Sequence, residues 1–212
     1  MEIDILHQDH PERGEVIDYI HRKYAQVYKA DIKTFMPHFI RLRNSKGGYR
    51  TVMGYRDAGQ YPLFLEQYLD VPVEAAIAGK VGDSVDRNLI VEIGNMVENE
   101  PGDARWAIIS ATAFLRQAGF RWVVFTGVGR MRNAFRRFGL EPIELAKADP
   151  TRLSAEEHAR WGSYYENGPT VFFSDIRTGY KNLQELWLML SNTWAGAVEQ
   201  GKRMRNEKES GQ

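Results

Sequence analysis

One carboxylate lies in the middle of a predicted strand. Glu92 stands between Val91 and Ile93, so strand alternation puts its side chain on the opposite face from those two, together with Gly94. A buried carboxylate is costly unless it is paired or used in chemistry. Two interpretations stay open: an ion pair with Arg87 or another arginine, and a general base whose pKa is raised by burial.

A run of basic residues without acidic neighbours follows this strand. Between Asp103 and Glu141 there is no acidic residue, whereas there are seven arginines: Arg105, Arg116, Arg121, Arg130, Arg132, Arg136 and Arg137. Four of them flank Asn133, beyond a second predicted strand that ends at Thr126, where ligands of open α/β sheets tend to bind. Because guanidinium groups bind phosphate and carboxylate, the run predicts a phosphate site or a surface for an acidic partner. The alternative is a solvated helix face whose charges are balanced elsewhere.

Two further segments combine polar groups with aromatic rings: Glu66, Gln67 and Tyr68 in the first, and His158, Trp161, Tyr164 and Tyr165 in the second. The first segment is suited to holding a polar substrate near the sheet, or to packing a helix at the edge of the core. The second could form the wall of an apolar groove, with hydroxyls that orient a ligand. A packed aromatic corner is the alternative for the second segment.

The chain offers few routes to other chemistry. Its five histidines form no HxH or HExxH pattern and it has no cysteine, so we predict no metal site. Ser163 lacks the GxSxG pattern of a nucleophilic serine. Lys+Arg and Asp+Glu both number 28, and this zero net charge argues against a nucleic-acid partner. A secretory signal and an apolar run long enough for a membrane span are both missing, so we expect a cytoplasmic protein.

A length of 212 residues fits one domain. Hydrophobic periodicity predicts a helix over 11–29, a hairpin over 39–56, helical segments at 63–69 and 72–78, a strand–helix–strand unit over 88–126, a short helix over 131–138, an edge strand over 140–145, a helix over 154–160 and a strand over 171–173. We expect a single domain over residues 1–180, a helix over 181–205 and a polar tail over 206–212.

The C-terminal helix carries an apolar stripe: Leu183, Leu186, Trp187, Leu190, Trp194 and Ala197. Such a stripe needs a surface to cover it. The candidates are the domain itself, a second copy of the chain in a homodimer, and a lipid interface.

The element order over residues 88–145 resembles the acyltransferase fold of GCN5-related N-acetyltransferases and acyl-homoserine lactone synthases. More specific motifs resemble the thermostable hemolysin family: PLFLEQYLD at 62–70, VEIGN at 91–95, FT at 125–126, segments within 145–153, and WGSYY at 161–165. The resemblance implies an α/β fold in which helices flank a mixed sheet, with the amphipathic helix at the C-terminus.

The resemblance also implies an activity, namely transfer of a fatty acyl group from a phosphopantetheine thioester to a small-molecule amine, without a tightly bound cofactor. In such folds the thioester arm lies between two splayed strands, and phosphate binds at the N-terminus of the next helix. The corresponding loop here, NEPGDA at 99–104, keeps Gly102 and Ala104. Because Glu98, Glu100 and Asp103 disfavour a pyrophosphate, we favour acyl carrier protein over coenzyme A as the donor.

Individual roles follow from the same resemblance. Glu92 would be the general base, directly or through water, and the backbone of Asn95, Met96 and Val97 would polarise the thioester carbonyl. The residues expected to hold the donor arm are Gly102, Ala104, Arg105, Thr126, Arg130, Arg132 and Asn133, and those expected to hold the substrate are Glu66, Tyr68, Trp161 and Tyr165.

The proton donor to the leaving thiolate needs a separate assignment. Phe135 stands where the fold commonly has a tyrosine for this role, so the acid would be Tyr164, Tyr165, His158 or water. Two other functions stay open: a membrane-active hemolysin that uses the C-terminal helix, and a thioester-binding protein without catalysis.

Overall fold

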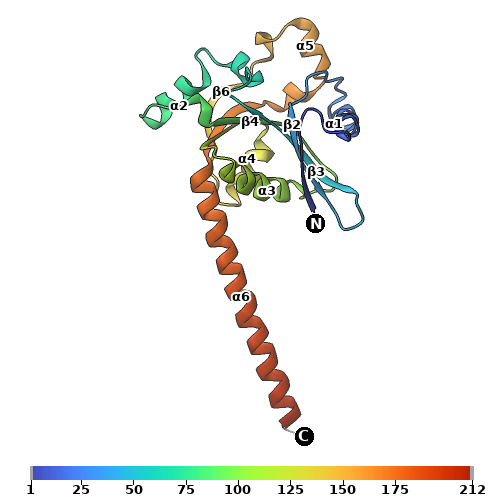
Figure 1. The fold of residues 1–212 in the computed structure, drawn as a ribbon, viewed down its shortest axis with the longest axis vertical. Helices are drawn as coiled ribbons and strands as arrows, with labels where there is room; N and C mark the ends of the chain where they lie inside the picture. The colour runs from blue at the N-terminus through green and yellow to red at the C-terminus, as the bar shows by residue number, and fades with distance from the viewer. Residues whose placement is uncertain (1, 211–212) are drawn as a thin grey trace.

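The computed structural model describes residues 2–210, without the side chains of residues 130, 201 and 203–210. Strands (β), α-helices (α) and 3-10 helices (η) follow one another in this order: β1 (Glu2–Leu6), α1 (Arg13–Tyr28), β2 (His38–Arg43), β3 (Tyr49–Asp57), η1 (Phe64–Tyr68), α2 (Val73–Val81), η2 (Arg87–Leu89), β4 (Ile90–Glu98), α3 (Ala104–Gln117), β5 (Trp122–Gly127), α4 (Gly129–Arg136), β6 (Ile143–Lys147), η3 (Pro150–Arg152), α5 (Ala155–Arg160), η4 (Tyr164–Asn167), β7 (Thr170–Asp175) and α6 (Ile176–Ser210) (Figure 1).

The described strands form one mixed sheet in the order β1-β2-β3-β4-β5-β7-β6. Only β4 and β5 run parallel, joined by the crossover helix α3, and the other neighbours are antiparallel. The predicted strand–helix–strand unit therefore supplies the centre of the sheet, and β6, predicted as an edge strand, lies at one edge. The expected architecture of a mixed sheet flanked by helices is confirmed.

Helices cover both faces of the sheet (Figure 1). On one face, residues of α3 and α4 such as Ile108 and Phe135 pack against Val91 and Ile93 of β4. On the other face, η1, α2 and α1 cover Ile90 and the neighbouring strands. Alternation along β4 thus sends Val91 and Ile93 to one core and Ile90 to the other, as the sequence predicts.

A β-bulge interrupts this alternation at Asn95. Its φ of 46° lies in the left-handed region, which asparagine tolerates better than most residues, and the register between β3 and β4 shifts at this point. Residues beyond the bulge therefore exchange faces. Val97 packs in the core of α1 rather than with Val91 and Ile93.

The two central strands separate directly before the bulge. Parallel pairing of β4 with β5 ends at Ile93 and Phe125. Beyond that pair β4 continues beside β3 as far as Glu98, while β5 continues beside β7 as far as Gly127. The sheet is consequently split at its centre, on the side where β4 and β5 end.

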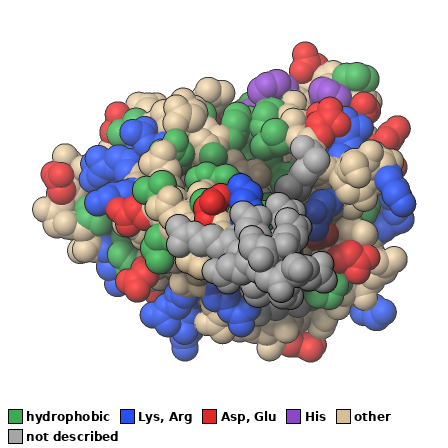
Figure 2. All heavy atoms as spheres, turned by 90° about the horizontal axis from the view of Figure 1, so that it is seen from below, with side chains coloured by type: hydrophobic (Ala, Val, Ile, Leu, Met, Phe, Trp, Pro, Cys, Tyr) green, Lys and Arg blue, Asp and Glu red, His purple; other side chains and the backbone are tan. Residues whose placement is uncertain are grey.

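Helix α6 leaves the domain as a single long projection (Figure 1). Its first turns are anchored, since Asn182 donates a hydrogen bond to the carbonyl oxygen of Gly139 and Gly179 lies against Leu140. Viewed along the helix from its C-terminal end, basic and acidic side chains are interspersed over the domain (Figure 2). No helix within residues 2–210 is both long and apolar enough to cross a membrane.

Most predicted elements are present with shifted ends. The predicted helix at 63–69 is instead the 3-10 helix η1, and α6 begins at Ile176 without a break after β7 rather than at residue 181. Strand β1 was not predicted, although it pairs along its whole length with β2. Ser154 caps α5 as expected, because its Oγ accepts a hydrogen bond from the Glu157 amide at 3.1 Å.

Candidate functional site

A cavity of about 400 Å³ occupies the split between β4 and β5. Its lining comes from both sides of the sheet: α3 and α4 on one side, and α1, η1 and the segment 161–165 on the other. Most of the lining side chains are apolar or aromatic. The cavity therefore connects the two faces of the sheet and can hold an extended, largely apolar ligand.

One wall of the cavity is a continuous set of seven aromatic rings: Tyr24, Tyr28, Phe64, Tyr68, Trp161, Tyr164 and Tyr165. Neighbouring ring centroids are 5.1 to 6.5 Å apart, which is the usual range for aromatic packing. The hydroxyls of Tyr68 and Tyr165 are hydrogen bonded to each other. This wall is apolar along its faces and carries several hydroxyl groups.

A tight backbone contact joins two parts of the aromatic wall. The amide and the hydroxyl of Ser163 both donate hydrogen bonds to the carbonyl oxygen of Tyr28, at 2.8 and 3.1 Å. Gly162 has a φ of 53°, and a Cβ there would overlap the same carbonyl oxygen. Glycine at this position therefore lets the segment 161–165 approach the end of α1.

The bulge forms the opposite wall of the cavity, and Asn95, Met96 and Val97 all line it. The side chain of Asn95 accepts a hydrogen bond from the Met36 amide at 2.8 Å, so it fixes the loop before β2 to the bulge. Met36 in turn covers Gly94, where an added Cβ would lie 2.6 Å from the Met36 Cε. The predicted carbonyl-binding segment thus borders the cavity and is rigidly held.

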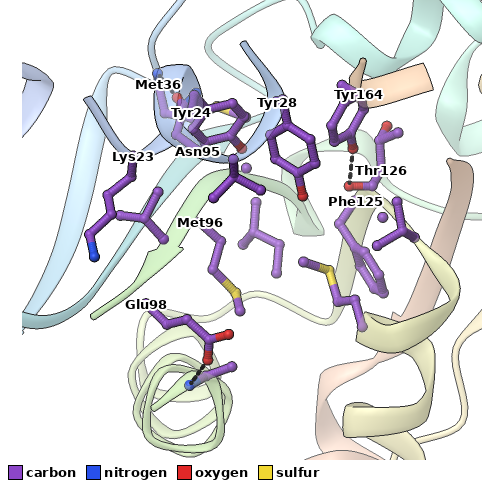
Figure 3. Close-up of a pocket in the computed structure, with 18 of the residues that line it drawn as sticks. Lys23, Tyr24, Tyr28, Met36, Asn95, Met96, Glu98, Phe125, Thr126 and Tyr164 are labelled. Carbon is purple, nitrogen blue, oxygen red and sulfur yellow. Dashed lines mark hydrogen bonds between the residues drawn. The ribbon is translucent and has the colours of Figure 1, made fainter. Parts of the chain in front are cut away.

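The N-terminus of α3 faces the cavity but already holds an anion. The carboxylate of Glu98 accepts a hydrogen bond from the Ala104 amide at 3.1 Å (Figure 3). Asp103, 4% exposed, is paired with Arg50 through contacts of 2.6 and 2.9 Å. Gly102 and Ala104 line the cavity as predicted, but the protein's own carboxylate occupies the position that favours a bound phosphate.

Hydroxyl groups gather at the end of β5. The Tyr164 hydroxyl donates a hydrogen bond of 3.4 Å to the carbonyl oxygen of Thr126, and the Tyr28 hydroxyl points into the space between β4 and β5 (Figure 3). The Thr126 hydroxyl is buried without a hydrogen-bond partner. Because an unpaired buried hydroxyl is costly, this group is suited to a polar atom of a ligand.

Glu92 is buried, with 3% of its surface exposed, at one end of the cavity but not in its lining. Its carboxylate accepts hydrogen bonds of 3.0 Å from the amides of Phe64 and Leu65 at the start of η1. Burial raises its pKa to about 7, although Arg56, 4.0 Å away, and the two amides act against the rise. A group that titrates near neutrality can take up a proton at working pH.

Several predicted residues lie outside the cavity lining, among them Glu66 and His158. Glu66 is engaged by Arg87 at 2.6 Å and by the Val73 amide at 3.1 Å, so it holds η1 to α2 instead of facing a ligand. Arg87, considered as a partner for Glu92, pairs instead with Glu66 and Glu74. His158 is exposed and touches the ring of Tyr165 edge-on at a centroid distance of 5.5 Å.

The predicted arginine surface lies on α3 and α4, beside the cavity rather than in it. Arg105 and Asn133 are exposed, and Arg132 is half-buried with its Nε unpaired. The side chain of Arg130 is outside the described residues. Within the described part of the chain, Arg105, Arg132, Arg136 and Arg137 form no ion pair. Phe135 stacks on Phe125 in the core.

Sequence reasoning missed five polar residues of the lining: Lys23, Tyr24, Tyr28, Thr34 and Arg56. The tyrosines belong to the stripe that predicts α1, so their spacing indicates packing rather than a site. Arg56 has a detectable signal, since it directly follows the β-prone run 50–55 and, by strand alternation, would share a face with Val52 and Gly54. No group of three or more His, Asp or Glu side chains within the described residues is arranged to hold a metal ion.

Three comparisons relate this architecture to known proteins. The family model described as thermostable hemolysin matches residues 6–180. Among solved structures, the chain is similar to MesI, a CoA-dependent acyl-homoserine lactone synthase, with a TM-score of 0.57 and 12% identity over 88% of this chain and 95% of that one. BjaI, another CoA-dependent acyl-homoserine lactone synthase, has a TM-score of 0.56 and 12% identity over 86% and 87%.

A third similar structure is FeeM, an N-acyl amino acid synthase from uncultured soil microbes, with a TM-score of 0.55 and 14% identity over 86% of this chain and 99% of that one. No protein of curated function matches the sequence significantly. At these identities the solved structures establish the fold, which is the GCN5-related N-acyltransferase-like fold.

Proposed function

This chain belongs to the thermostable hemolysin family, and we propose that it is an acyltransferase that moves a fatty acyl group from a phosphopantetheine thioester to an amine. The observation that carries the proposal is the cavity at the split in the sheet, which is lined from both faces and is mostly apolar. MesI, BjaI and FeeM have the same fold: MesI and BjaI are acyl-homoserine lactone synthases, and FeeM is an N-acyl amino acid synthase. A thioester arm can enter from one side of such a cavity and an amine from the other.

The two walls have complementary tasks in this proposal. Backbone amides of the bulge, from Asn95 to Val97, polarise the thioester carbonyl and stabilise the negative charge that develops on its oxygen. The unpaired Thr126 hydroxyl binds a polar atom of the pantetheine arm. Met131 and Ile108, which line the side toward α3 and α4, supply apolar contact.

The reaction is an aminolysis in which the charges balance. An ammonium group gives up one proton, and the nitrogen lone pair then forms a bond to the thioester carbon while the carbon–sulfur bond breaks. The nitrogen loses a second proton and the thiolate gains one, leaving an amide, a thiol and one released proton. Tyr164 donates to the thiolate, and Glu92 accepts a proton through an intervening water because it lies outside the lining.

The α3 N-terminus supports a carrier protein as the donor. Glu98 already caps this helix, and a coenzyme A pyrophosphate would meet the Glu98 carboxylate. The phosphopantetheine of a carrier protein brings a single phosphodiester and an acidic protein surface. The arginines of α3 and α4 without ion pairs, among them Arg132 and Arg136, are available to that surface.

The first experiment incubates the protein with matched acyl-carrier-protein and acyl-coenzyme A thioesters and a mixture of amines and amino acids. Thiol release reports only on the reaction, because the chain has no cysteine, and mass spectrometry identifies the N-acyl product. We expect transfer with the carrier-protein thioesters. Folded protein that releases no thiol from any donor would contradict the proposal.

Variants separate the chemistry from the fold. Glu92→Gln removes the proton acceptor, so the rise of kcat through neutral pH should disappear. Tyr61→Phe is the control, since Tyr61 lies outside the cavity lining and its loss should leave kcat unchanged. A Glu92→Gln variant that keeps the full rate and pH profile would exclude the proposed role of Glu92.

A further inference from the structure

Arg56 is a cation in the cavity lining, beside Phe64 and Tyr68. Its side chain is 13% exposed, and its Nη1 donates a hydrogen bond to the Pro62 carbonyl oxygen at 2.8 Å. Its Nε is buried, lies 4.0 Å from a Glu92 carboxylate oxygen and has no hydrogen-bond partner within the described residues. A largely buried guanidinium that lines a mostly apolar cavity is costly unless a close counter-charge compensates it.

The protein only partly balances this charge. The ion pair that Arg56 forms within the described residues is with Glu92, at 4.0 Å, which is long for such a pair. Both Glu92 oxygens are also engaged by the backbone amides at the start of η1. The guanidinium lines the cavity, and its Nη2 forms no hydrogen bond within the described residues. A carboxylate is the group that fits a guanidinium with a donor to spare.

We propose that Arg56 binds the carboxylate of the acyl acceptor, so that the acceptor is an amino acid whose amine is directed toward the thioester. This inference rests on the proposed acyltransferase function and specifies its second substrate. The rings of Phe64, Tyr68 and Trp161 line the same cavity, and they favour an amino acid with an apolar or aromatic side chain.

The test compares acceptors that differ only in the carboxylate. Phenylalanine is compared with phenethylamine, and leucine with isopentylamine, using the same acyl-carrier-protein donor throughout. β- and γ-Amino acids measure how far apart the amine and the carboxylate must be. We expect kcat/KM for the amino acid to exceed that for the amine about 10- to 100-fold, as for a charge-assisted hydrogen bond. Arg56→Gln should remove this preference mainly through KM, and Arg56→Lys should restore part of it.

Arg152→Gln is the matched control, because Arg152 pairs with Asp70 at 2.7 Å outside the cavity lining. Tryptophan fluorescence during donor titration checks that the Arg56 variants still bind thioester. Equal rates for amino acids and amines would overturn the Arg56 proposal but not acyl transfer. If no acceptor is acylated, the proposed function itself would be overturned.

A separate observation concerns the exposed part of α6. Trp187 and Trp194 are 73% and 76% exposed, and Leu190 is 57% exposed. Together with Leu183 and Ala197 they follow alternating spacings of four and three residues, the 3.5-residue period of a coiled coil. Helices in water draw most of their stability from packing, so this projecting face needs a partner.

The charges of this segment indicate the partner. Residues 183–200 contain two acidic residues, Glu185 and Glu199, and no lysine or arginine. A helix that binds an anionic lipid surface needs basic residues on its polar face. The positions that flank the heptad stripe, among them Leu186 and Val198, are uncharged, so two copies meet without like-charge repulsion.

We infer that the stripe on α6 packs against α6 of a second copy of the chain. Multi-angle light scattering of the full chain should give a dimer, and Trp187→Glu with Leu190→Glu should give a monomer. Leu188→Glu is the control, because Leu188 is 61% exposed but lies off the stripe. A monomeric wild type, or leakage of anionic liposomes that depends on Trp187, would overturn this inference.

Discussion

Replacing Glu92 by glutamine should change how the stability of the protein depends on pH. Burial raises the pKa of Glu92 from 4.5 to about 7, so ionising it costs more in the folded than in the unfolded chain. The cost is absent below pH 4.5, where both states are protonated. It grows between pH 4.5 and 7 and is fully present above pH 7. Glutamine cannot ionise, so the variant should not incur this cost.

The size of the effect follows from the pKa difference. A rise from 4.5 to about 7 corresponds to about 3 kcal/mol, at about 1.4 kcal/mol per pKa unit. Part of this gain is offset, because the amides of Phe64 and Leu65 donate to both carboxylate oxygens and a glutamine amide accepts through only one oxygen. That loss is similar at all pH values and does not alter the slope.

Urea titrations at pH 5 and pH 8 measure the free energies of unfolding of both proteins. The difference in unfolding free energy between variant and wild type should shift in favour of the variant by about 2.5 kcal/mol over this range, because part of the cost is already present at pH 5. The other titrating groups are the same in both proteins and cancel. Glu66→Gln is the control: Arg87 lowers the pKa of Glu66, so its stabilisation is lost only as the pH falls below 4.5, and its difference should be flat. A flat difference for Glu92→Gln would refute the assignment of a burial-raised pKa.

Three further predictions concern the cavity walls. Tyr164→Phe should lower kcat of acyl transfer about 100-fold by removing the acid, measured as thiol release; an unchanged kcat would exclude Tyr164 as the acid. Glu98→Gln should narrow the preference for carrier protein over coenzyme A about tenfold, since one repulsive charge is removed; an unchanged ratio of kcat/KM values would contradict the electrostatic argument. Gly54→Ala should lower the free energy of unfolding by about 1 to 3 kcal/mol, because the new Cβ would lie 2.5 Å from the Met36 Cβ. Gly94→Ala should lower it less, because the new Cβ meets only the flexible end of the same side chain, the Met36 Cε. Equal losses by urea titration would show that Met36 moves as a whole.

Periodicity predicts the centre of the fold because α3, β4 and β5 are strongly patterned. Strand β1 escaped prediction although Ile3 and Ile5 alternate with Glu2 and Asp4. A five-residue edge strand carries little local signal, and its pairing with β2 bridges more than thirty residues of sequence. Its existence is decided by tertiary pairing, which single-sequence patterns do not contain.

The aromatic part of the candidate site was easier to predict than its charged part. Trp161, Tyr164 and Tyr165 form a dense local cluster, and all three line the cavity, while their chemical roles stay predictions. The role of a charged residue depends on its partner, and that partner is usually distant in the sequence, so local patterns do not identify it. Arg87 was considered for Glu92 but pairs with Glu66, because η1 and α2 bring that carboxylate closer.

The bulge explains the remaining gap between sequence and structure. Alternation along β4 holds from Ile90 to Gly94, and an unbroken strand would send Glu98 to the same face as Glu92. Asn95 adds one residue to the register, so Glu98 instead reaches the N-terminus of α3 and accepts from the Ala104 amide. One left-handed residue thereby both shapes the strand edge that borders the cavity and places the carboxylate that we expect to disfavour a pyrophosphate.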